Sequence, residues 1–257
     1  MKPVALEWIG TRTVAFERTR EFFRGVLDLN VGAERPSFVR FDLPDGSSLE
    51  VFRPGGPDDH SYFTTGPVIG FQVEEFDSAR SELEHVGLAL LGPVGGTPGE
   101  YRWQHFRGPD GSVYEIVDDP GRRSSDRKVP VGRCGVTGFG WVGVRTSRFD
   151  AMRRFALEQM RLTVEDEEDG LVEFRFPNGH VLELFRPGSE WDHPHLTTGP
   201  LPGLVVEDLE RAESTLRAHG IEILQRRRFE EAGWSHFRAP DGCVYEIKRF
   251  SDDGPRS

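Results

Sequence analysis

Apolar and polar residues alternate along this chain in two rhythms that follow one another in a fixed order. Short stretches such as EWIGTRT and VIGFQV are typical of strands, whereas FERTREFFRGVL and DLERAESTLRAHG carry apolar residues at helical spacing. Two further strands follow, such as FVRFDL and SLEVFR, joined by PDG or PNG, in which Pro and Gly favour a tight hairpin. Asp208 is expected to cap the last helix. The pattern predicts a βαβββ module.

The module is repeated, because long stretches of the first half recur in the second. Trp8 of EWIGTRT returns as Trp141 of GWVGVRT, and Glu50 of LEVFRPG returns as Glu183 of LELFRPG. WQHFRGPDGSVYEI likewise returns as WSHFRAPDGCVYEI, starting at Trp234. Such agreement over a whole half indicates duplication.

A fainter repeat lies inside each half, where PDGSSLEV resembles PDGSVYEI, so the chain contains four copies of one module. A stretch rich in Pro, Gly, Ser and charge separates the halves and has the composition of a linker. We therefore expect a first domain over residues 1–118, a linker over 119–135, a second domain over 136–250 and a tail over 251–257.

A βαβββ module whose PDG hairpin leads into a strand carrying a Glu resembles the vicinal-oxygen-chelate superfamily, which includes glyoxalase I, extradiol dioxygenases and the fosfomycin and bleomycin resistance proteins. The resemblance covers both halves and implies an α+β fold with tandem paired modules, in which two cup-shaped mixed sheets carry helices outside. We expect each half to form one eight-stranded sheet related to the other half by an approximate two-fold axis. Pairing of modules between the halves is the alternative.

The resemblance also implies where a metal would lie. In that superfamily a divalent metal at the base of the cup is held by a His or Gln on the first strand and a Glu on the last strand of each module. The positions that match the metal-binding His are Trp8, Val68, Trp141 and Leu201. Two carboxylates alone lack the imidazoles that suit zinc, iron or nickel, so we expect no metal cofactor. The alternative is a divalent metal at a shifted site, formed by Glu50, Glu115 and His105 or by Glu183, Glu246 and His236.

The side chains expected to point into the cups are aromatic with a few polar groups, which is typical of a small-molecule pocket. The expected ligand-binding residues are Trp8, Arg12, Arg40, Glu50, Phe52, Trp103, Trp141, Arg145, Glu173, Glu183, Phe185 and Trp234. The candidate catalytic pairs are His105 with Glu115 and His236 with Glu246, because imidazole is suited to proton transfer near neutral pH.

Each of these residues also has a purely structural interpretation. Trp8 and Trp141 can fill the space of a lost metal, and the four Glu can be relics paired with Arg12, Arg40 or Arg145. His105 and His236 can simply bond to a neighbouring strand. His60 and His193, in the connections between modules, are expected to cap turns or to be exposed, and the repeated FRPG and TTGP are expected to carry the backbone across the cup.

The two cups are expected to differ in charge. The charged residues assigned to the first cup are Arg12, Arg40, Glu50 and Glu115, and those assigned to the second are Arg145, Glu173, Glu183 and Glu246. The first is nearly balanced and the second is acidic. An acidic, aromatic cup should prefer a cationic or amine-bearing ligand, and the balanced cup a neutral or carboxylate-bearing one.

Composition narrows the class of protein. The 257 residues include 32 Lys and Arg against 43 Asp and Glu, and a net charge of −11 disfavours nucleic acid or an anionic membrane as a partner. The sequence shows neither a signal peptide nor a membrane-spanning run, so we expect a cytoplasmic protein with free thiols at Cys134 and Cys243. It should be a monomer with internal pseudo-two-fold symmetry or a homodimer.

Two candidate functions follow from the cup residues. The first is metal-free binding of an aromatic or cationic metabolite or drug. The second is an enzyme of lyase or isomerase type that uses His and Glu as acid and base.

Overall fold

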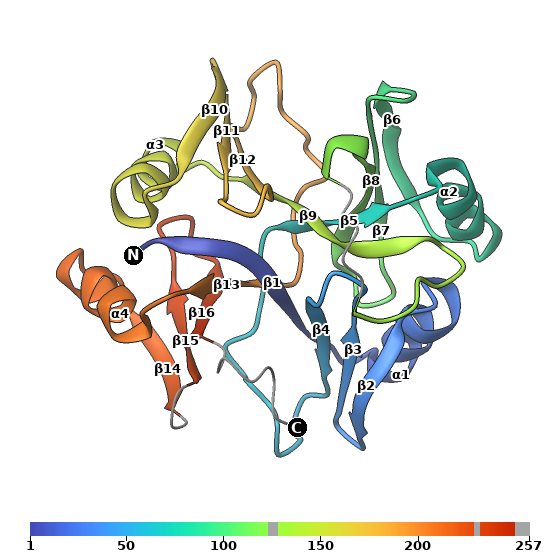
Figure 1. Cartoon of the computed structure of the whole chain (residues 1–257), viewed down its shortest axis with the longest axis horizontal. Helices are drawn as coiled ribbons and strands as arrows, with labels where there is room; N and C mark the ends of the chain where they lie inside the picture. Colours follow the sequence, from blue (N-terminus) through green and yellow to red (C-terminus); the bar gives the residue numbers. More distant parts are fainter. Residues whose placement is uncertain (123–127, 229–231, 250–257) are drawn as a thin grey trace.

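Four βαβββ modules follow one another in the computed structural model, which describes residues 1–122, 128–228 and 232–249 (Figure 1). The first module is β1 (Pro3–Arg12), α1 (Phe16–Glu21) with the π-helical turn η1 (Phe22–Val26), β2 (Asn30–Arg35), β3 (Phe38–Asp42) and β4 (Ser48–Phe52). The second is β5 (Val68–Val73), α2 (Phe76–His85), β6 (Leu90–Thr97), β7 (Tyr101–Arg107) and β8 (Val113–Asp118), followed by a short 3₁₀ helix η2 (Pro120–Arg122).

The second half of the chain repeats this order. The third module is β9 (Val136–Arg145), α3 (Phe149–Arg154) with the π-helical turn η3 (Phe155–Met160), β10 (Thr163–Glu168), β11 (Leu171–Arg175) and β12 (Val181–Phe185). The fourth is β13 (Leu201–Val206), α4 (Leu209–Ala218), β14 (Ile223–Arg228), β15 (Gly233–Arg238) and β16 (Val244–Arg249). The modules predicted from the apolar pattern are therefore confirmed. The predicted tail and part of the predicted linker lie outside the described residues.

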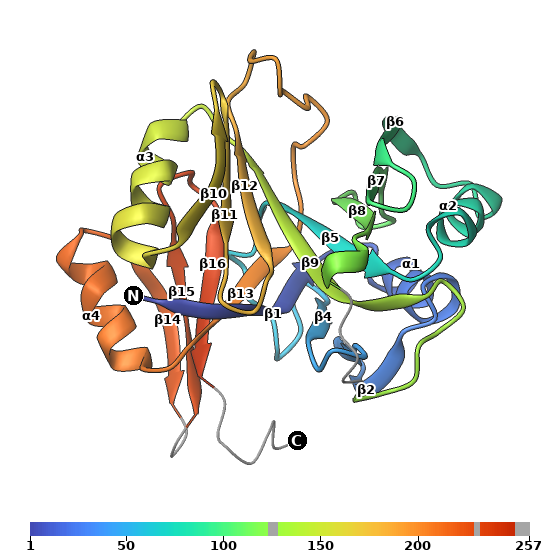
Figure 2. The same cartoon turned by 45° about the horizontal axis from the view of Figure 1, so that its top comes forward.

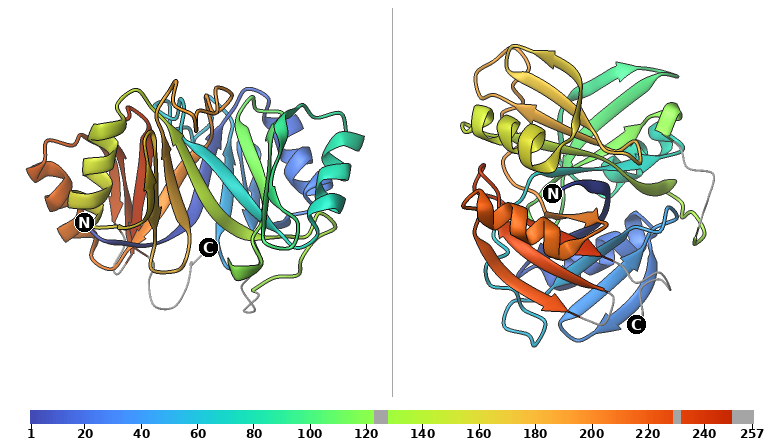
Figure 3. Two further views of the ribbon diagram at one scale, coloured as in Figure 1. Left: turned by 90° about the horizontal axis from the view of Figure 1, so that it is seen from above. Right: turned by 60° about the vertical axis from the view of Figure 1, so that its left-hand side comes forward.

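The modules pair between the halves. One eight-stranded sheet has the order β14-β15-β16-β13-β1-β4-β3-β2 and joins the fourth module to the first, so we call it the terminal sheet. The other has the order β10-β11-β12-β9-β5-β8-β7-β6 and joins the third module to the second, so we call it the central sheet. Figure 3 shows the two curled sheets side by side with the helices at the outer ends. Our expectation that each half forms its own sheet is wrong.

The packing of the helices explains this arrangement. The ring of Phe23 in η1 lies 5.8 Å from that of Phe41 in its own module, and 6.3 and 5.8 Å from those of Phe71 and Tyr114 in the second module. The two modules of one half therefore share a core on their helix sides, and Figure 2 shows α1 beside α2 and α3 beside α4. Because β1 and β5 then belong to different sheets, each must cover its open edge with the first strand of a module from the other half.

The two connections that cross between the sheets meet each other. The backbone N–H of Gly66 donates to the carbonyl of Gly199 at 2.9 Å, and that of Gly199 donates to Gly66 at the same distance. Thr65 and Thr198, 133 residues apart, are also in contact at 3.2 Å between their hydroxyls. A Cβ at Gly66 would collide with the backbone of Pro200, so the close approach needs glycine. Reciprocal contacts between equivalent residues are those that a local two-fold axis produces.

Several local predictions are confirmed. In the first hairpin Gly46 has a φ of +91° and its N–H donates to the carbonyl of Leu43 at 2.9 Å. The side chain of Asp208 accepts a hydrogen bond from the N–H of Arg211 at 2.9 Å and caps α4. Cys134 and Cys243 are both free thiols. Within the described ranges, every helix is too short or too polar to cross a bilayer.

Pairing between the halves can be tested with engineered disulfides in a protein that carries Cys134→Ser and Cys243→Ser. Ala5 lies opposite Val205 in the β1–β13 pair, so Ala5→Cys with Val205→Cys should form an intramolecular disulfide, because residues directly opposite in antiparallel strands lie within reach of a disulfide. The bond would be mapped by mass spectrometry of non-reduced peptides.

The matched control for this test is Ala5→Cys with Gln72→Cys. Gln72 is the equivalent of Val205 in the first half and would lie near Ala5 only if the modules of one half paired with each other. This control should stay reduced. A disulfide in the control, together with none in the first variant, would contradict the observed pairing.

Candidate functional site

The inner face of each sheet carries the side chains that strand alternation predicted. Trp8, Phe38, Phe52, Leu201 and Val244 form one buried cluster on the terminal sheet. Val68, Val113, Trp141, Val181 and Phe185 form the equivalent cluster on the central sheet. Leu49, Val51, Tyr114 and Ile116 lie in the separate core on the helix side, as expected. We call the two inner faces the terminal cup and the central cup.

The pairing of modules changes which residues share a cup. The sequence-predicted residues of the terminal cup are Trp8, Arg12, Arg40, Glu50, Phe52, Trp234, His236 and Glu246. Those of the central cup are Trp103, His105, Glu115, Trp141, Arg145, Glu173, Glu183 and Phe185. The predicted grouping of Glu50 with Glu115, and of Glu183 with Glu246, is therefore wrong. Neither shifted metal site is assembled, because each would need residues from both sheets.

An indole ring lies across glycine at the base of each cup. Glu50 pairs with Gly10 of β1, and Glu246 pairs with Gly203 of β13, so glycine lies beside each carboxylate. A Cβ on Gly10 would overlap the ring of Trp8, and one on Gly203 would lie 2.9 Å from Cβ of Trp8 and 3.2 Å from Oε1 of Glu246. Because Gly10 and Gly203 have no side chains, the indole can lie directly against the backbone between the two carboxylates.

The central cup repeats this base with its own residues. A Cβ on Gly143 would overlap the ring of Trp141. A Cβ on Gly70 would lie 2.8 Å from Oε1 of Glu115 and 3.1 Å from Cβ of Trp141. In both cups the indole therefore lies where two first strands meet.

Charged groups of both signs gather in the terminal cup. Burial raises the pKa of Glu50 to about 7, and the charge of Glu246 adds to this rise, while Lys248, a hydrogen bond from Trp8 and Arg40 oppose it. Burial likewise lowers the pKa of Lys248, against the effect of Glu246 and Glu50. The ammonium of Lys248 lies 5.9 Å from the ring centroid of Trp8. Sequence reasoning did not single out Lys248.

Both predicted His–Glu pairs are assembled. His236 lies opposite Glu246 in the β15–β16 pair, and His105 lies opposite Glu115 in the β7–β8 pair. In each pair Nε2 of the imidazole is 3.2 Å from Oε2 of the carboxylate. All four side chains are buried. Burial lowers the pKa of His105 to about 4, which keeps this imidazole neutral at physiological pH.

The connections that cross between the sheets pass over the cups, as expected for the FRPG and TTGP segments, but sequence reasoning missed the contacts of their side chains with the buried His residues. Residues 53–67 form the terminal lid, in which the hydroxyl of Tyr62 is 2.8 Å from Nδ1 of His236. Residues 186–200 form the central lid, in which Nε2 of His195 is 3.0 Å from Nδ1 of His105. Burial, with the charge of His105, lowers the pKa of His195 to about 4.

His60 and His193 also belong to the lids, which corrects the expectation that they cap turns or are exposed. The ring of His60 stacks on Phe63 at 4.8 Å and lies 5.4 Å from His236. That of His193 lies 5.3 Å from Phe185. Both His residues are half-buried. The repetition of His at the same place in DDHSYFTTGP and WDHPHLTTGP was the signal in the sequence, but only the fold brings these loops over the cups.

Two of the predicted ligand-binding arginines anchor the lids. Nε of Arg12 is 2.5 Å from Oδ1 of Asp59, and Nε of Arg145 is 2.6 Å from Oδ1 of Asp192. The hydrogen bond from Arg12 lowers the pKa of Asp59 to about 2. Because each guanidinium holds a lid aspartate in two hydrogen bonds, the proposed pairing of these arginines with the cup glutamates is not realised.

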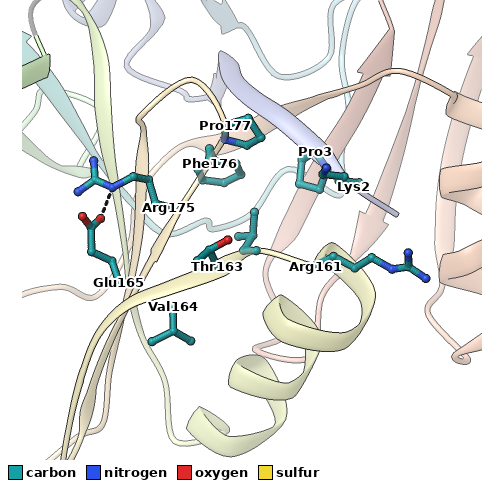
Figure 4. Close-up of a pocket in the computed structure, with 10 residues that line it drawn as sticks. Lys2, Pro3, Arg161, Thr163, Val164, Glu165, Arg175, Phe176 and Pro177 are labelled. Carbon is teal, nitrogen blue, oxygen red and sulfur yellow. Dashed lines mark ion pairs between the residues drawn. The ribbon is translucent and has the colours of Figure 1, made fainter.

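A cavity of about 510 Å³ lies away from the cups, between the start of β1 and the strands β10 and β11 (Figure 4). Arg175 and Glu165 form an ion pair along one side of it. Its other charged lining residues, Lys2 and Arg161, are exposed to solvent. No residue from the predicted site lines this cavity.

Residues 5–116 match the sequence profile of the Glyoxalase/Bleomycin resistance protein/Dioxygenase superfamily. Among solved structures, a putative dioxygenase from Bacillus subtilis subsp. subtilis str. 168 superposes with a TM-score of 0.69 at 18% identity, covering 96% of this chain and 86% of that one. Glyoxalase I from Zea mays superposes with a TM-score of 0.63 at 14% identity, covering 95% and 92%. A search of curated proteins found no significant match. The first half of the chain therefore matches the sequence profile of this superfamily, and the chain as a whole shares the fold of these two structures.

The metal that this superfamily implies does not fit the donors present. At the base of the terminal cup Glu50 and Glu246 are accompanied on the first strands by Trp8 and Leu201, and the central cup has Trp141 and Val68 at the same places. Indole and aliphatic side chains supply no lone pair for zinc, iron or nickel. Across the described part of the chain, no three His, Cys, Asp or Glu side chains are arranged to hold a metal ion. No chemical step is therefore derived through a metal.

The raised pKa of Glu50 predicts how stability depends on pH. A carboxyl with a pKa of about 7 when folded and its usual 4.5 when unfolded binds more protons in the folded state between these values. Its contribution to the free energy of unfolding is therefore lost as the pH rises through this window. Glu50→Gln cannot ionise, so its stability relative to wild type should increase by on the order of 2 kcal/mol between about pH 5 and about pH 8. Urea denaturation at both pH values measures this, and a difference that does not change with pH would contradict it.

Proposed function

We propose that this protein binds a small organic molecule in one or both cups without a catalytic metal. The observation that supports this proposal is the convergence of Glu50, Glu246, His236 and Lys248, contributed by two different modules, on the aromatic base of one cup. Aromatic walls with a few convergent polar groups are the usual composition of a ligand site.

The cost of this arrangement favours a ligand-binding role over a purely structural one. Moving charged groups out of water destabilises a fold, and well-packed apolar residues of similar size often stabilise it more than a buried ion pair does. The buried pair of Glu246 and His236 in the terminal cup has a counterpart in Glu115 and His105 of the central cup. The same buried pair therefore occurs in both cups. Groups with shifted pKa values that cluster in a concave site are typical of functional sites.

The lids provide a route into the cups. Each lid is a connection without helix or strand, held at one end by an Arg–Asp ion pair and at the other by the Gly66–Gly199 contact. Between these two points the side chains of Tyr62 and His195 occupy the space above the buried His residues. A ligand enters when the segment between the two anchors moves outward, which requires no change in either sheet.

The second candidate function is acid–base catalysis in the terminal cup. The observation that favours it is the chain of contacts from Tyr62 through His236 to Glu246, at 2.8 and 3.2 Å. Nδ1 of this imidazole contacts the hydroxyl, whereas Nε2 lies beside the carboxylate and has no hydrogen-bond partner among the described residues, so Nε2 can exchange a proton with a bound carbonyl compound. The central cup does not suit this role, because a base whose pKa is lowered to about 4, such as His105, is weak at neutral pH.

Ligand binding predicts a change in melting temperature. We expect at least one compound from a set of aromatic amines, aromatic carboxylates and neutral aromatic molecules to raise the melting temperature by several degrees at saturation, because a ligand that binds only the folded state stabilises it. Glu246→Gln should abolish the effect of a terminal-cup ligand and Glu183→Gln that of a central-cup ligand. If no charge class shifts the melting temperature and native mass spectrometry finds no co-purified molecule, the proposal is wrong.

Metal independence gives a separate prediction. Added zinc, nickel or iron should leave the melting temperature of the untagged protein unchanged, because the cup bases offer carboxylates without imidazole partners from the first strands. Elemental analysis of protein purified without an affinity tag should find less than about one tenth of an equivalent of metal, well short of the single ion that one cup would hold. Stoichiometric metal would show that the proposal of a metal-free site is incorrect.

A further inference from the structure

We propose that the cavity beside the start of β1 is a docking site for a short peptide segment that carries an acidic side chain. The cavity lies between β1 and the strands β10 and β11, and none of the residues assigned to the two cups lines it. The inference therefore goes beyond the proposed function of the cups. In the first half of the chain the equivalent place is already filled by a peptide segment.

The two places are equivalent in backbone geometry as well as in sequence. Arg161, which lines the cavity, lies 133 residues after Asp28, the same spacing as between Thr65 and Thr198. Among the described residues other than glycine, Arg161 and Asp28 are the two with a positive φ, at +57° and +55°. Each lies between the π-helical turn of its module and the next strand.

In the first half the linker fills this place. Residues 128–134 pass over it without helix or strand. Nδ2 of Asn30 donates to the carbonyl of Pro130 at 2.8 Å, and the backbone N–H of Arg133 donates to Oδ2 of Asp28 at 3.0 Å. Nε of Arg133 also lies 3.5 Å from this carboxylate oxygen. A segment with a basic side chain is therefore bound at an acidic residue.

In the second half the described residues leave the same place open. Met1 is the counterpart of Cys134, and both side chains are buried, so the described chain contains no counterpart of residues 130–133. The cavity of about 510 Å³ lies at that position. Its lining includes the counterparts of three residues that the linker contacts. These are Arg161 for Asp28, Thr163 for Asn30 and Pro177 for Pro44.

The charge at this place is reversed between the halves. The second half has Arg161 at the position of Asp28, and Lys2 adds a second basic side chain to the lining. Among the described residues neither of these two forms an ion pair, and both are exposed. An acidic side chain placed as Arg133 is in the first half would therefore pair with Arg161.

The acidic residue of the lining does not cancel this charge. Glu165 pairs with Arg175 on the side of the cavity opposite Lys2 and Arg161 (Figure 4). Nη2 of Arg175 also lies 3.6 Å from Oε1 of Glu173, so the charge of this arginine is balanced by acids of its own sheet. Lys2 and Arg161 thus remain as the charged groups on the other side.

Further basic groups gather at the start of β1. Burial lowers the pKa of the amine of Met1, and the charges of Arg161 and Arg211 lower it further. Glu207 follows the β13 residue that lies opposite Pro3, and within the described ranges it forms no ion pair. The side of the cavity next to β1 is therefore basic.

The cavity also offers groups that bind a peptide backbone. Among the described residues, the hydroxyl of Thr163 and the carbonyl of Pro177 have no hydrogen-bond partner, whereas their counterparts Asn30 and Pro44 bind the backbone of the linker. The buried ring of Phe176 adds apolar surface to the lining. Because an exposed ion pair alone contributes little, the affinity depends on these contacts together with the charge.

The test uses fluorescence anisotropy with the untagged full-length protein at low salt and two peptides labelled at the N-terminus. Both have the sequence of residues 128–133 with an amidated C-terminus, and one carries Arg133→Glu. We expect the acidic peptide to bind with a dissociation constant on the order of 100 μM and at least about tenfold more tightly than the unchanged peptide, because only the acidic peptide pairs with Arg161.

An exchange of charge then locates the site. Arg161→Asp should weaken binding of the acidic peptide at least about tenfold and should let the unchanged peptide bind about as tightly as the acidic one binds wild type. Asp suits the backbone there, since Asp28 has nearly the same φ. The matched control is Arg18→Asp, which makes the same change at an exposed residue of α1 away from the cavity. Its affinity should stay within about twofold of wild type, and circular dichroism verifies that each variant is folded.

Several results would overturn the proposal. They are equal binding of the two peptides, binding of the acidic peptide that Arg161→Asp leaves unchanged, and no binding at protein concentrations up to about 1 mM. Displacement of the acidic peptide by an equal concentration of inorganic phosphate would also overturn it, because the site would then select a small anion. All of these results leave ligand binding in the cups intact, since the cup residues do not line this cavity.

Discussion

The open edge of each module's first strand is the constraint on which this structure depends. A module alone would leave the backbone groups of β1, β5, β9 or β13 unpaired along one side. Antiparallel pairing of β1 with β13 and of β5 with β9 satisfies these groups and, at the same junction, creates the base of each cup. The choice of partner strand therefore decides both the architecture and which side chains can act together.

The same junction sets the chemistry of the cups. Glycine beside each glutamate lets Trp8 or Trp141 lie flat across the base, so an indole separates two carboxylates that come from different halves of the chain. The aromatic base and the His–Glu pairs are alike in the two cups, whereas two strand positions differ in charge, with Glu173 in place of Arg40 and Val117 in place of Lys248. The two cups therefore share the same strand arrangement and aromatic base but differ in these charged side chains.

The lids are a consequence of pairing between halves. Because the two modules of each half belong to different sheets, residues 53–67 and 186–200 must each leave one cup and enter the other sheet. These connections pass over the cups, and their His and aromatic side chains reach the buried His residues. Since the two lids meet at Gly66 and Gly199, the segments above the two cups are in direct contact near the local two-fold axis.

The sequence by itself determined the modules, the hairpins and the faces of the strands, because these depend on local periodicity and on turn residues such as Pro44 and Gly46. It also identified the His–Glu pairs, since each pair lies on neighbouring strands of one module. Only the tertiary structure decided that Glu50 shares a cup with Glu246 and not with Glu115. The first strands of all four modules are equivalent in pattern, and pairing within or between halves satisfies the same backbone groups. The choice depends on long-range packing, in which Phe23 fills a core shared by two modules, and no local signal in the sequence carries that information.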